Sequence, residues 1–335
     1  MQMTSKYQKP AFLNIFLGGV GTEAARVLRE LYEADGKPFP ARLVQIDTDP
    51  IPSPHVDQSI LLPLDGLKVD AITSDPERFG PIAVTIVQHY SKLLNPEDVH
   101  NGARTIRLLT QLAFLFFRDK VIQQLRNCLI GLATEGGFDA VIPVFISSSG
   151  GGTGSALQIL LAQAFLARDF RSYLTEGFKL GFLETPIAFA VEPFALAMRH
   201  KRMHADKVLG NSYAFRYESS LLEEPRGFKY LFHVGFASDQ GTVLDTPDEI
   251  AMVLGTSIYQ LERNWLAIKS KFVDVFDVHI LQSRYGGTDI PEKRLRSPTA
   301  IPVPQRPLSA PKNGQPKDDD PIFAGTHIES HRKGE

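Results

Sequence analysis

Cysteine is almost absent from this sequence, since Cys128 is the only one in 335 residues. A single thiol cannot form an internal disulfide, and it disfavours a structural zinc site, which needs clustered ligands. Such sparse use of cysteine is typical of a reducing compartment. We therefore expect a cytoplasmic protein.

Long apolar runs are missing as well. The longest, at 112–117, lies between Gln111 and Arg118 and is far shorter than the roughly 20 residues that span a bilayer. Residues 1–10 lack the apolar centre of a signal peptide. These two absences predict a soluble chain with no membrane partner.

The sequence also has little excess charge of either sign. Its 36 basic and 38 acidic residues leave a formal net charge of −2. Bulk electrostatics would therefore not attract a polyanion, and we expect no nucleic-acid partner. The hydrophobic share of 43% is ordinary for a globular protein.

What the sequence does contain is a regular alternation of short apolar runs and amphipathic segments. Residues 11–19 are typical of a buried strand and 22–34 of a helix, and 138–149 is apolar almost throughout, like a parallel strand covered on both faces. Alternation of this kind predicts an α/β fold, with a Rossmann-like parallel sheet and helices on both faces.

Three segments depart from this alternation. Residues 50–80 are rich in proline, aspartate and glycine, which predicts a long surface excursion. Residues 101–133 predict one long helix or two. From 288 onward proline and charge replace apolar residues, which predicts a disordered C-terminal tail.

Two glycine-rich loops each separate a predicted strand from a predicted helix. The first contains Gly18, Gly19 and Gly21, and the second is the stretch 147–155, SSSGGGTGS. Each glycine costs roughly 0.5–1 kcal/mol of backbone entropy relative to alanine. Glycine also lets the amides at a helix N-terminus approach a phosphate. No lysine follows the glycines as in a P-loop, so charge neutralisation falls to the amides and Mg²⁺.

The first loop also fits another class of protein. Residues 19–24, GVGTEA, match the dinucleotide fingerprint G-x-G-x-x-A, and Asp47 ends the next predicted strand, where a ribose-binding acid would lie. An NAD-dependent oxidoreductase is therefore an alternative. It gives no role to the second loop, whereas two such loops suit one phosphate chain held from both sides.

The second loop resembles a known family. Its GGGTGSA is close to the tubulin/FtsZ signature GGGTGS[GA]. Four other stretches are similar to nucleotide-binding segments of that family, in order and spacing: GGVGTEAARVL, IDTDP, NGARTIR and AVEPF. The resemblance covers 12–194, somewhat more than half of the chain, and its details look closest to divergent bacterial tubulin-like proteins.

The resemblance implies a GTP-binding protein with GTP or GDP and Mg²⁺. It further implies a GTPase that forms GDP and phosphate and assembles with itself into cytoskeletal filaments. The domains would be a GTP-binding domain at 11–245, a core helix with a short, reduced second region at 246–287, and a tail at 288–335 that recruits an unknown protein. A GTP-bound scaffold that does not hydrolyse is a further alternative.

The resemblance also implies a set of nucleotide-binding residues. They are Gly18, Gly19, Gly21, Thr22, Asp47, Asp49, Gly102, Ala103, Arg104, Ser149, Gly150, Gly151, Gly152, Thr153, Gly154, Ser155, Glu192 and Asn211. Gly102 to Arg104 would face the terminal phosphate, with Arg107 as a second candidate cation. Glu192 would meet the ribose. Asn211, Asp239 and the ring of Tyr259 are candidates for recognising guanine.

Several of these residues have other interpretations. Asp47 and Asp49 fit the caps of a turn, Arg104 and Arg107 a solvated helix face, and Glu192 an ordinary acid at the end of a strand. The catalytic acids that the family implies, Asp274 and Asp277, keep a D-x-x-D spacing, but Phe272 replaces the family's asparagine. They fit equally well the solvent-facing acids of an alternating strand.

Overall fold

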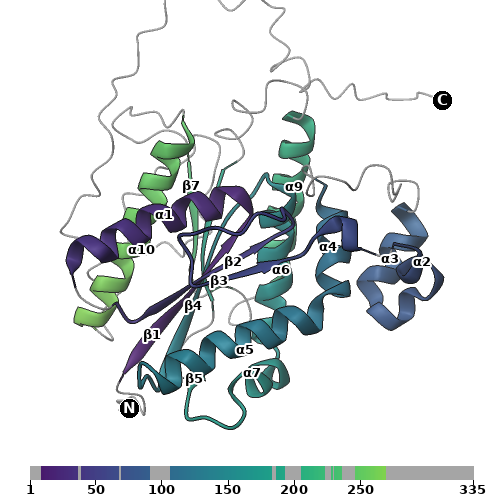
Figure 1. The fold of residues 1–335 in the computed structure, drawn as a ribbon. Helices are drawn as coiled ribbons and strands as arrows, with labels where there is room; N and C mark the ends of the chain where they lie inside the picture. Colours follow the sequence, from purple (N-terminus) through teal and green to yellow (C-terminus); the bar gives the residue numbers. More distant parts are fainter. Residues whose placement is uncertain are drawn as a thin grey trace, which may run out of the picture.

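A single parallel sheet forms the centre of the molecule. The computed structural model describes residues 9–36, 39–67, 69–90, 106–182, 186–192, 205–222, 228, 230–235 and 246–268. Within them seven strands form the sheet in the order β3-β2-β1-β4-β6-β7, with β5 paired to β4 (Figure 1). Every described pairing is parallel. The predicted α/β class is confirmed.

The strands are apolar because helices cover both faces of the sheet. All nine residues of β4 are buried, and it lies beside β1 at the centre of the sheet. The strands are β1 (Pro10–Leu17), β2 (Ala41–Asp47), β3 (Gln58–Leu61), β4 (Ala140–Ser148), β5 (Gly181–Phe182), β6 (Ile187–Val191) and β7 (Tyr230–Val234).

Two helices cover one face of the sheet, α1 (Gly18–Asp35) and α10 (Pro247–Ile268). Their apolar side chains form a core with Phe12 and Phe16 of β1. The helices approach closely at Gly255, where a Cβ atom would lie 2.7 Å from the side chain of Val27. They run in the same direction, so the N-terminus of α10 lies toward the N-terminal half of α1.

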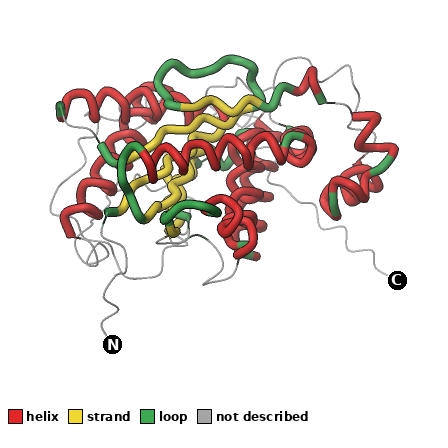
Figure 2. Tube along the Cα trace, turned by 60° about the horizontal axis from the view of Figure 1, so that its bottom comes forward, coloured by secondary structure: helices red, strands yellow, loops and turns green. Residues whose placement is uncertain are grey.

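The helices α4 (Arg107–Phe116), α5 (Arg118–Thr134), α6 (Gly152–Leu166), α7 (Arg168–Thr175) and α9 (Ala205–Leu221) form the other layer. Leu112, Leu157 and Phe215 belong to the core on this side, with β1 residues such as Leu13. Figure 2 shows the strands between the two helical layers. The helices α2 (Val69–Ser74) and α3 (Pro81–Tyr90) and the short 3-10 helices η1 (Leu64–Gly66) and η2 (Pro76–Phe79) extend to one side (Figure 1).

The segment 50–80 differs from its prediction. It does not remain an excursion, because β3 adds to the sheet beside β2, and Ile60 and Leu62 are fully buried. The apolar run at 60–62 is too short to show a period. Proline and aspartate flank it, and they led to the prediction of a surface excursion. The segment 101–133 forms two helices over its described part, with a turn at Phe117.

A polar cluster is buried between the sheet and its α1–α10 layer. The amide of Asn14 donates to Glu262 Oε1 at 2.7 Å, and the hydroxyl of Tyr32 donates to the other carboxyl oxygen. Glu262 is fully buried, and this burial raises the pKa of its carboxyl group to about 8. The side chain therefore holds a proton at neutral pH, which avoids a buried charge.

This raised pKa predicts a stability that depends on pH. Between about pH 4.5 and 8 the folded state keeps the proton of Glu262 and the unfolded state releases it, so the free energy of unfolding falls as pH rises. The slope from this group approaches about 1.4 kcal/mol per pH unit. Glu262→Gln, which imitates the protonated form, should lose most of this slope between about pH 6 and 8, as urea denaturation would measure.

Glu33→Gln is the matched control, because Glu33 is exposed on α1. It should keep the slope of the unaltered protein. An equal slope in Glu262→Gln and in the unaltered protein would contradict the assignment of a buried proton to this cluster.

Candidate functional site

The two glycine-rich segments, which we continue to call loops, follow neighbouring strands of the sheet. The glycines of the first one differ from their prediction, because they form the start of α1 directly after β1. β1 and β4 pair with Phe16 opposite Ile146 near their carboxyl ends. The helix after β1 packs on one face of the sheet and the helix after β4 on the other (Figure 1). In open parallel sheets, ligands bind outside the carboxyl ends of strands at the point where the connections diverge in this way.

Glycine allows the two loops to touch. Gly18 has a φ of 70°, and a Cβ atom there would lie 3.3 Å from the amide nitrogen of Gly154. A Cβ atom on Gly154 would lie 2.9 Å from the carbonyl oxygen of Leu17, and one on Gly21 would lie 2.6 Å from that of Ile146. Each helix therefore begins against the end of the other strand, and the structure brings the predicted loops together.

Both helices begin without a cap. The N-cap positions, Leu17 for α1 and Gly151 for α6, make no side-chain cap hydrogen bond, and neither first turn contains an acidic residue. The first amides of a helix have no acceptor within the helix and carry partial positive charge. Gly19 is exposed, and no atom lies within 4 Å of a Cβ built on it. These features suit the approach of an anion.

Some of the predicted ligand groups already have protein partners. The amides of Gly150 and Gly151 donate to Ser148 Oγ at 3.1 and 3.2 Å. The hydroxyls of Thr22 and Ser155 donate to carbonyl oxygens one helical turn before them. The amides at 18–20 and 152–154 are thus the groups best placed for a ligand.

The turn after β2 lies beside these loops. The hydroxyl of Thr48 and that of Thr153 form a hydrogen bond of 2.7 Å, which joins the turn to the start of α6. Asp47 Oδ1 accepts the amide of Asp49, and Asp49 Oδ1 accepts the amide of Ile51, both at 3.2 Å. Both carboxylates therefore cap the turn. Burial raises the pKa of Asp47 to about 6.

Helix α9 is attached to the second glycine loop. Asn211 Nδ2 donates to the carbonyl oxygen of Gly150 at 3.0 Å, and the hydroxyl of Ser212 lies 3.2 Å from that of Ser149. These contacts place Asn211 beside the loop, as a base-recognising residue requires. Sequence reasoning did not single out Ser148 of β4 or Ser212 of α9, because a serine in a strand or helix carries no distinctive pattern.

Arg107 is a buried residue of α4 that contacts α9. Its side chain is 7% exposed, so it is not on a solvated helix face. Its guanidinium donates to the carboxylate of Glu218 and to the main-chain oxygen of Asn211. These contacts tie α4 to α9, and a role of Arg107 toward the terminal phosphate stays a prediction.

Glu192 lies at the end of β6 and is 1% exposed. Its carboxylate is 2.8 Å from both the guanidinium of Arg216 and Nδ1 of His233. Burial raises the pKa of Glu192, but His233 and Arg216 together lower it further, so the net shift is downward. Sequence reasoning missed both partners because they come from separate elements, α9 and β7. The role of Glu192 toward ribose stays a prediction.

Tyr259 lies far from the glycine loops. Its ring centroid is 6.1 Å from that of Tyr32 and 5.9 Å from that of Phe39. Tyr32 is about 21 Å along α1 from Gly18, at 1.5 Å per residue. The prediction that Tyr259 stacks on a base beside these loops is therefore wrong.

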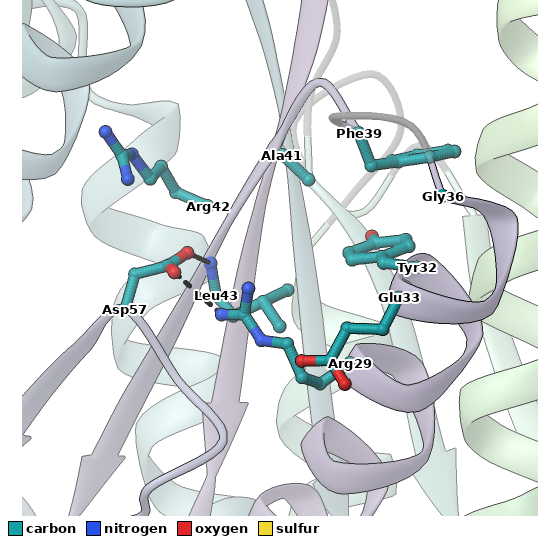
Figure 3. A pocket seen from close by; sticks show the side chains of 9 residues that line it. All are labelled: Arg29, Tyr32, Glu33, Gly36, Phe39, Ala41, Arg42, Leu43 and Asp57. Carbon is teal, nitrogen blue, oxygen red and sulfur yellow. Dashed lines mark hydrogen bonds and ion pairs between the residues drawn. The ribbon is translucent and has the colours of Figure 1, made fainter.

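A pocket of about 360 Å³ opens near this end of α1. Arg29, Tyr32 and Asp57 are among its lining residues, and the guanidinium of Arg29 is 2.7 Å from the carboxylate of Asp57 (Figure 3). None of the predicted site residues lines this pocket.

Other predicted residues lie outside the described part of the chain. They are Gly102, Ala103, Arg104, Asp239, Asp274 and Asp277, together with the tail from 288. Among the residues that are described, no group of three or more histidine, cysteine, aspartate or glutamate side chains could hold a metal ion. No helix within the described ranges is long and apolar enough to cross a membrane.

No protein-family model and no curated protein matches the sequence. Among solved structures, CetZ2 from Haloferax volcanii, a GTPγS-bound protofilament, is 14% identical, with 77% of this chain and 60% of that chain covered and a TM-score of 0.46. CetZ from Methanosaeta thermophila is 12% identical, with 78% and 54% covered and a TM-score of 0.42. TubZ from the Clostridium botulinum phage c-st is 11% identical, with 79% and 61% covered and a TM-score of 0.41.

This chain thus spans 54% to 61% of the length of those three structures.

Proposed function

We propose that this chain is a tubulin-like GTP-binding protein whose nucleotide phosphates lie between the starts of α1 and α6. One observation carries the proposal: a Cβ atom on Gly18 would be 3.3 Å from the amide nitrogen of Gly154, so two uncapped helix N-termini meet. Each N-terminus carries about half a positive charge. A chain of phosphates is the ligand class that two such termini attract.

The phosphate oxygens would accept hydrogen bonds from the amides at 18–20 and 152–154. The space above Gly19 is open to a ligand. The hydroxyl of Thr153 can exchange its partner Thr48 for a phosphate oxygen, since a hydroxyl both donates and accepts. The amides take the place of the lysine that a P-loop would supply.

Mg²⁺ would be bound mainly by the nucleotide phosphates, with few ligands from the protein. It prefers phosphate and carboxylate oxygens and often binds through only one or two carboxylates. Asp47 and Asp49 are the acids of the adjoining turn, and the raised pKa of Asp47 means that its charge lacks compensation there. A nearby cation would provide that compensation.

The choice of guanine rests on the GGGTGSA signature, and Asn211 is the candidate that recognises it. Its amide lies against the carbonyl oxygen of Gly150. An amide side chain has both donors and an acceptor, as the edge of guanine requires. Asp239 remains a second candidate outside the described residues.

Hydrolysis and assembly form the second part of the proposal. In-line attack of water on the terminal phosphate would be assisted by Mg²⁺ and the loop amides. Asp274 and Asp277 would position this water in a neighbouring subunit, so that filament formation completes the site. A protein that binds GTP without turnover would instead be a scaffold.

Calorimetric titration of the purified chain with GTP, ATP and NAD in the presence of Mg²⁺ tests the binding proposal. We expect GTP to bind at least about tenfold more tightly than ATP, a difference of about 1.4 kcal/mol. Binding of NAD without GTP would overturn the proposal in favour of the oxidoreductase alternative.

Phosphate release and light scattering test the second part. We expect GTP-dependent turnover that rises with protein concentration, and its loss in Asp274→Ala and Asp277→Ala. GTP binding should persist in both variants. Turnover that is absent from the unaltered protein would leave the scaffold as the function.

A further inference from the structure

One face of α9 carries large apolar side chains in solvent. Tyr213, Tyr217 and Leu221 are 74%, 67% and 60% exposed, and they are three of the seven large apolar side chains exposed in the described part of the chain. Residues four apart lie above one another on a helix, so these three form one stripe. We call this stripe the tyrosine face.

The opposite side of α9 is fixed to the domain. Phe215 is fully buried in the core, and Asn211 and Glu218 bind the second glycine loop and Arg107. The exposure of the two tyrosines is therefore a property of a well-anchored helix. Exposed tyrosine has an apolar ring with a hydrogen-bonding tip, which suits recognition of a peptide.

The chain itself contains a peptide of the matching kind. It continues for 67 residues beyond Ile268, and the segment 301–311 reads IPVPQRPLSAP. Pro304 and Pro307 form a P-x-x-P pair, which favours the polyproline II helix with three residues per turn. Aromatic surfaces bind such segments at low entropic cost, because the peptide is already extended.

We propose that the tyrosine face binds the proline-rich segment 301–311 of the same chain. The rings of Tyr213 and Tyr217 would pack against proline rings. Leu221 would extend the apolar contact by one helical turn.

Charge and chain length are consistent with this assignment. Residues 293–317 contain six basic side chains and no acidic one. Asp206 is exposed on the same side of α9, about two turns before Tyr213, so the face offers a carboxylate to a basic peptide. Residues 269–300 can extend to about 105 Å, several times the length of about 25 Å expected for α9.

Disulfide trapping in the full chain tests the proposal. Cys128 is buried, so introduced cysteines provide the reactive thiols. Ser220→Cys places a thiol beside Tyr217, and Gln305→Cys places one between the two prolines. We expect this pair to form an intramolecular disulfide in at least about ten times the yield of the control pair, Ser172→Cys with Gln305→Cys, because Ser172 is exposed on α7.

Adding Tyr213→Ala and Tyr217→Ala to the Ser220→Cys pair should lower the yield at least about fivefold. Both tyrosines are exposed, so circular dichroism should show an unchanged fold. A synthetic peptide of residues 299–312 in excess should also lower the yield, and the same peptide with alanine at 304 and 307 should not. Equal yields for the two cysteine pairs, a yield insensitive to the tyrosines, or a purely intermolecular product would overturn the proposal.

Discussion

Gly21→Ala should lower the free energy of unfolding by about 3 kcal/mol, at the upper end of the usual effect of overpacking. The added methyl group would lie 2.6 Å from the carbonyl oxygen of Ile146 and 3.1 Å from the backbone of Phe16. Neither neighbour is a flexible side chain. The start of α1 would have to move away from β4 to relieve the overlap. Urea denaturation followed by circular dichroism measures the effect.

Gly19→Ala is the matched control, two residues away in the same helical turn. No atom lies within 4 Å of a Cβ at this position, so we expect no destabilisation and a gain of up to about 1 kcal/mol from the lower backbone entropy of alanine in the unfolded chain. If the two substitutions destabilise the protein equally, the close approach of α1 to β4 is wrong. The same result would remove the basis for placing the two loops together.

Gly19→Val should weaken GTP binding about 100-fold, which corresponds to about 2.7 kcal/mol. The valine side chain would occupy the open space that the proposal gives to the phosphates. The fold should persist, because this side chain meets no protein atom near its Cβ. Titration calorimetry with GTP and Mg²⁺ measures the loss.

Ala34→Val serves as its control, since Ala34 is exposed near the other end of α1. It adds similar bulk to the same helix and should leave GTP affinity unchanged. Equal affinities for Gly19→Val and the unaltered protein would show that the phosphates do not pass over Gly19.

The expected effects of substitution at Gly21 and at Gly19 separate the glycines into two groups. Gly21 and Gly154 permit contacts between backbone segments, and Gly19 leaves space at an exposed position. The sequence indicates that glycine is required in both loops. It does not show which glycines permit backbone contact and which leave space for a ligand. Only the register of β1 beside β4 shows which Cβ atoms would meet the backbone.

Much of the fold could be predicted because parallel strands and amphipathic helices have distinct periods. The α/β class, a helix beside each glycine-rich segment and the position of both segments at the strand ends all follow from local pattern. The start of the first helix does not, because Gly18, Gly19 and Gly21 lie within α1 and not in a loop before it. The edge strand β3 was missed because Ile60 and Leu62 lie in a run too short to show a period among prolines and acids.

The details of the site were less predictable because they depend on contacts between distant segments. Arg107 is bound by Glu218, which lies 111 residues later in the chain. Glu192 is held by Arg216 and His233 of two further elements. The sequence shows which chemical groups a residue carries. Whether those groups already bind a protein partner depends on how distant segments pack.

Amide chemical shifts in a ¹⁵N-labelled chain test most directly whether both loops hold the same phosphates. On addition of a non-hydrolysable GTP analogue with Mg²⁺, the amides at 18–20 and at 152–154 should shift together and saturate at the same nucleotide concentration. Shifts in only one of the two groups, or in neither, would contradict the shared site.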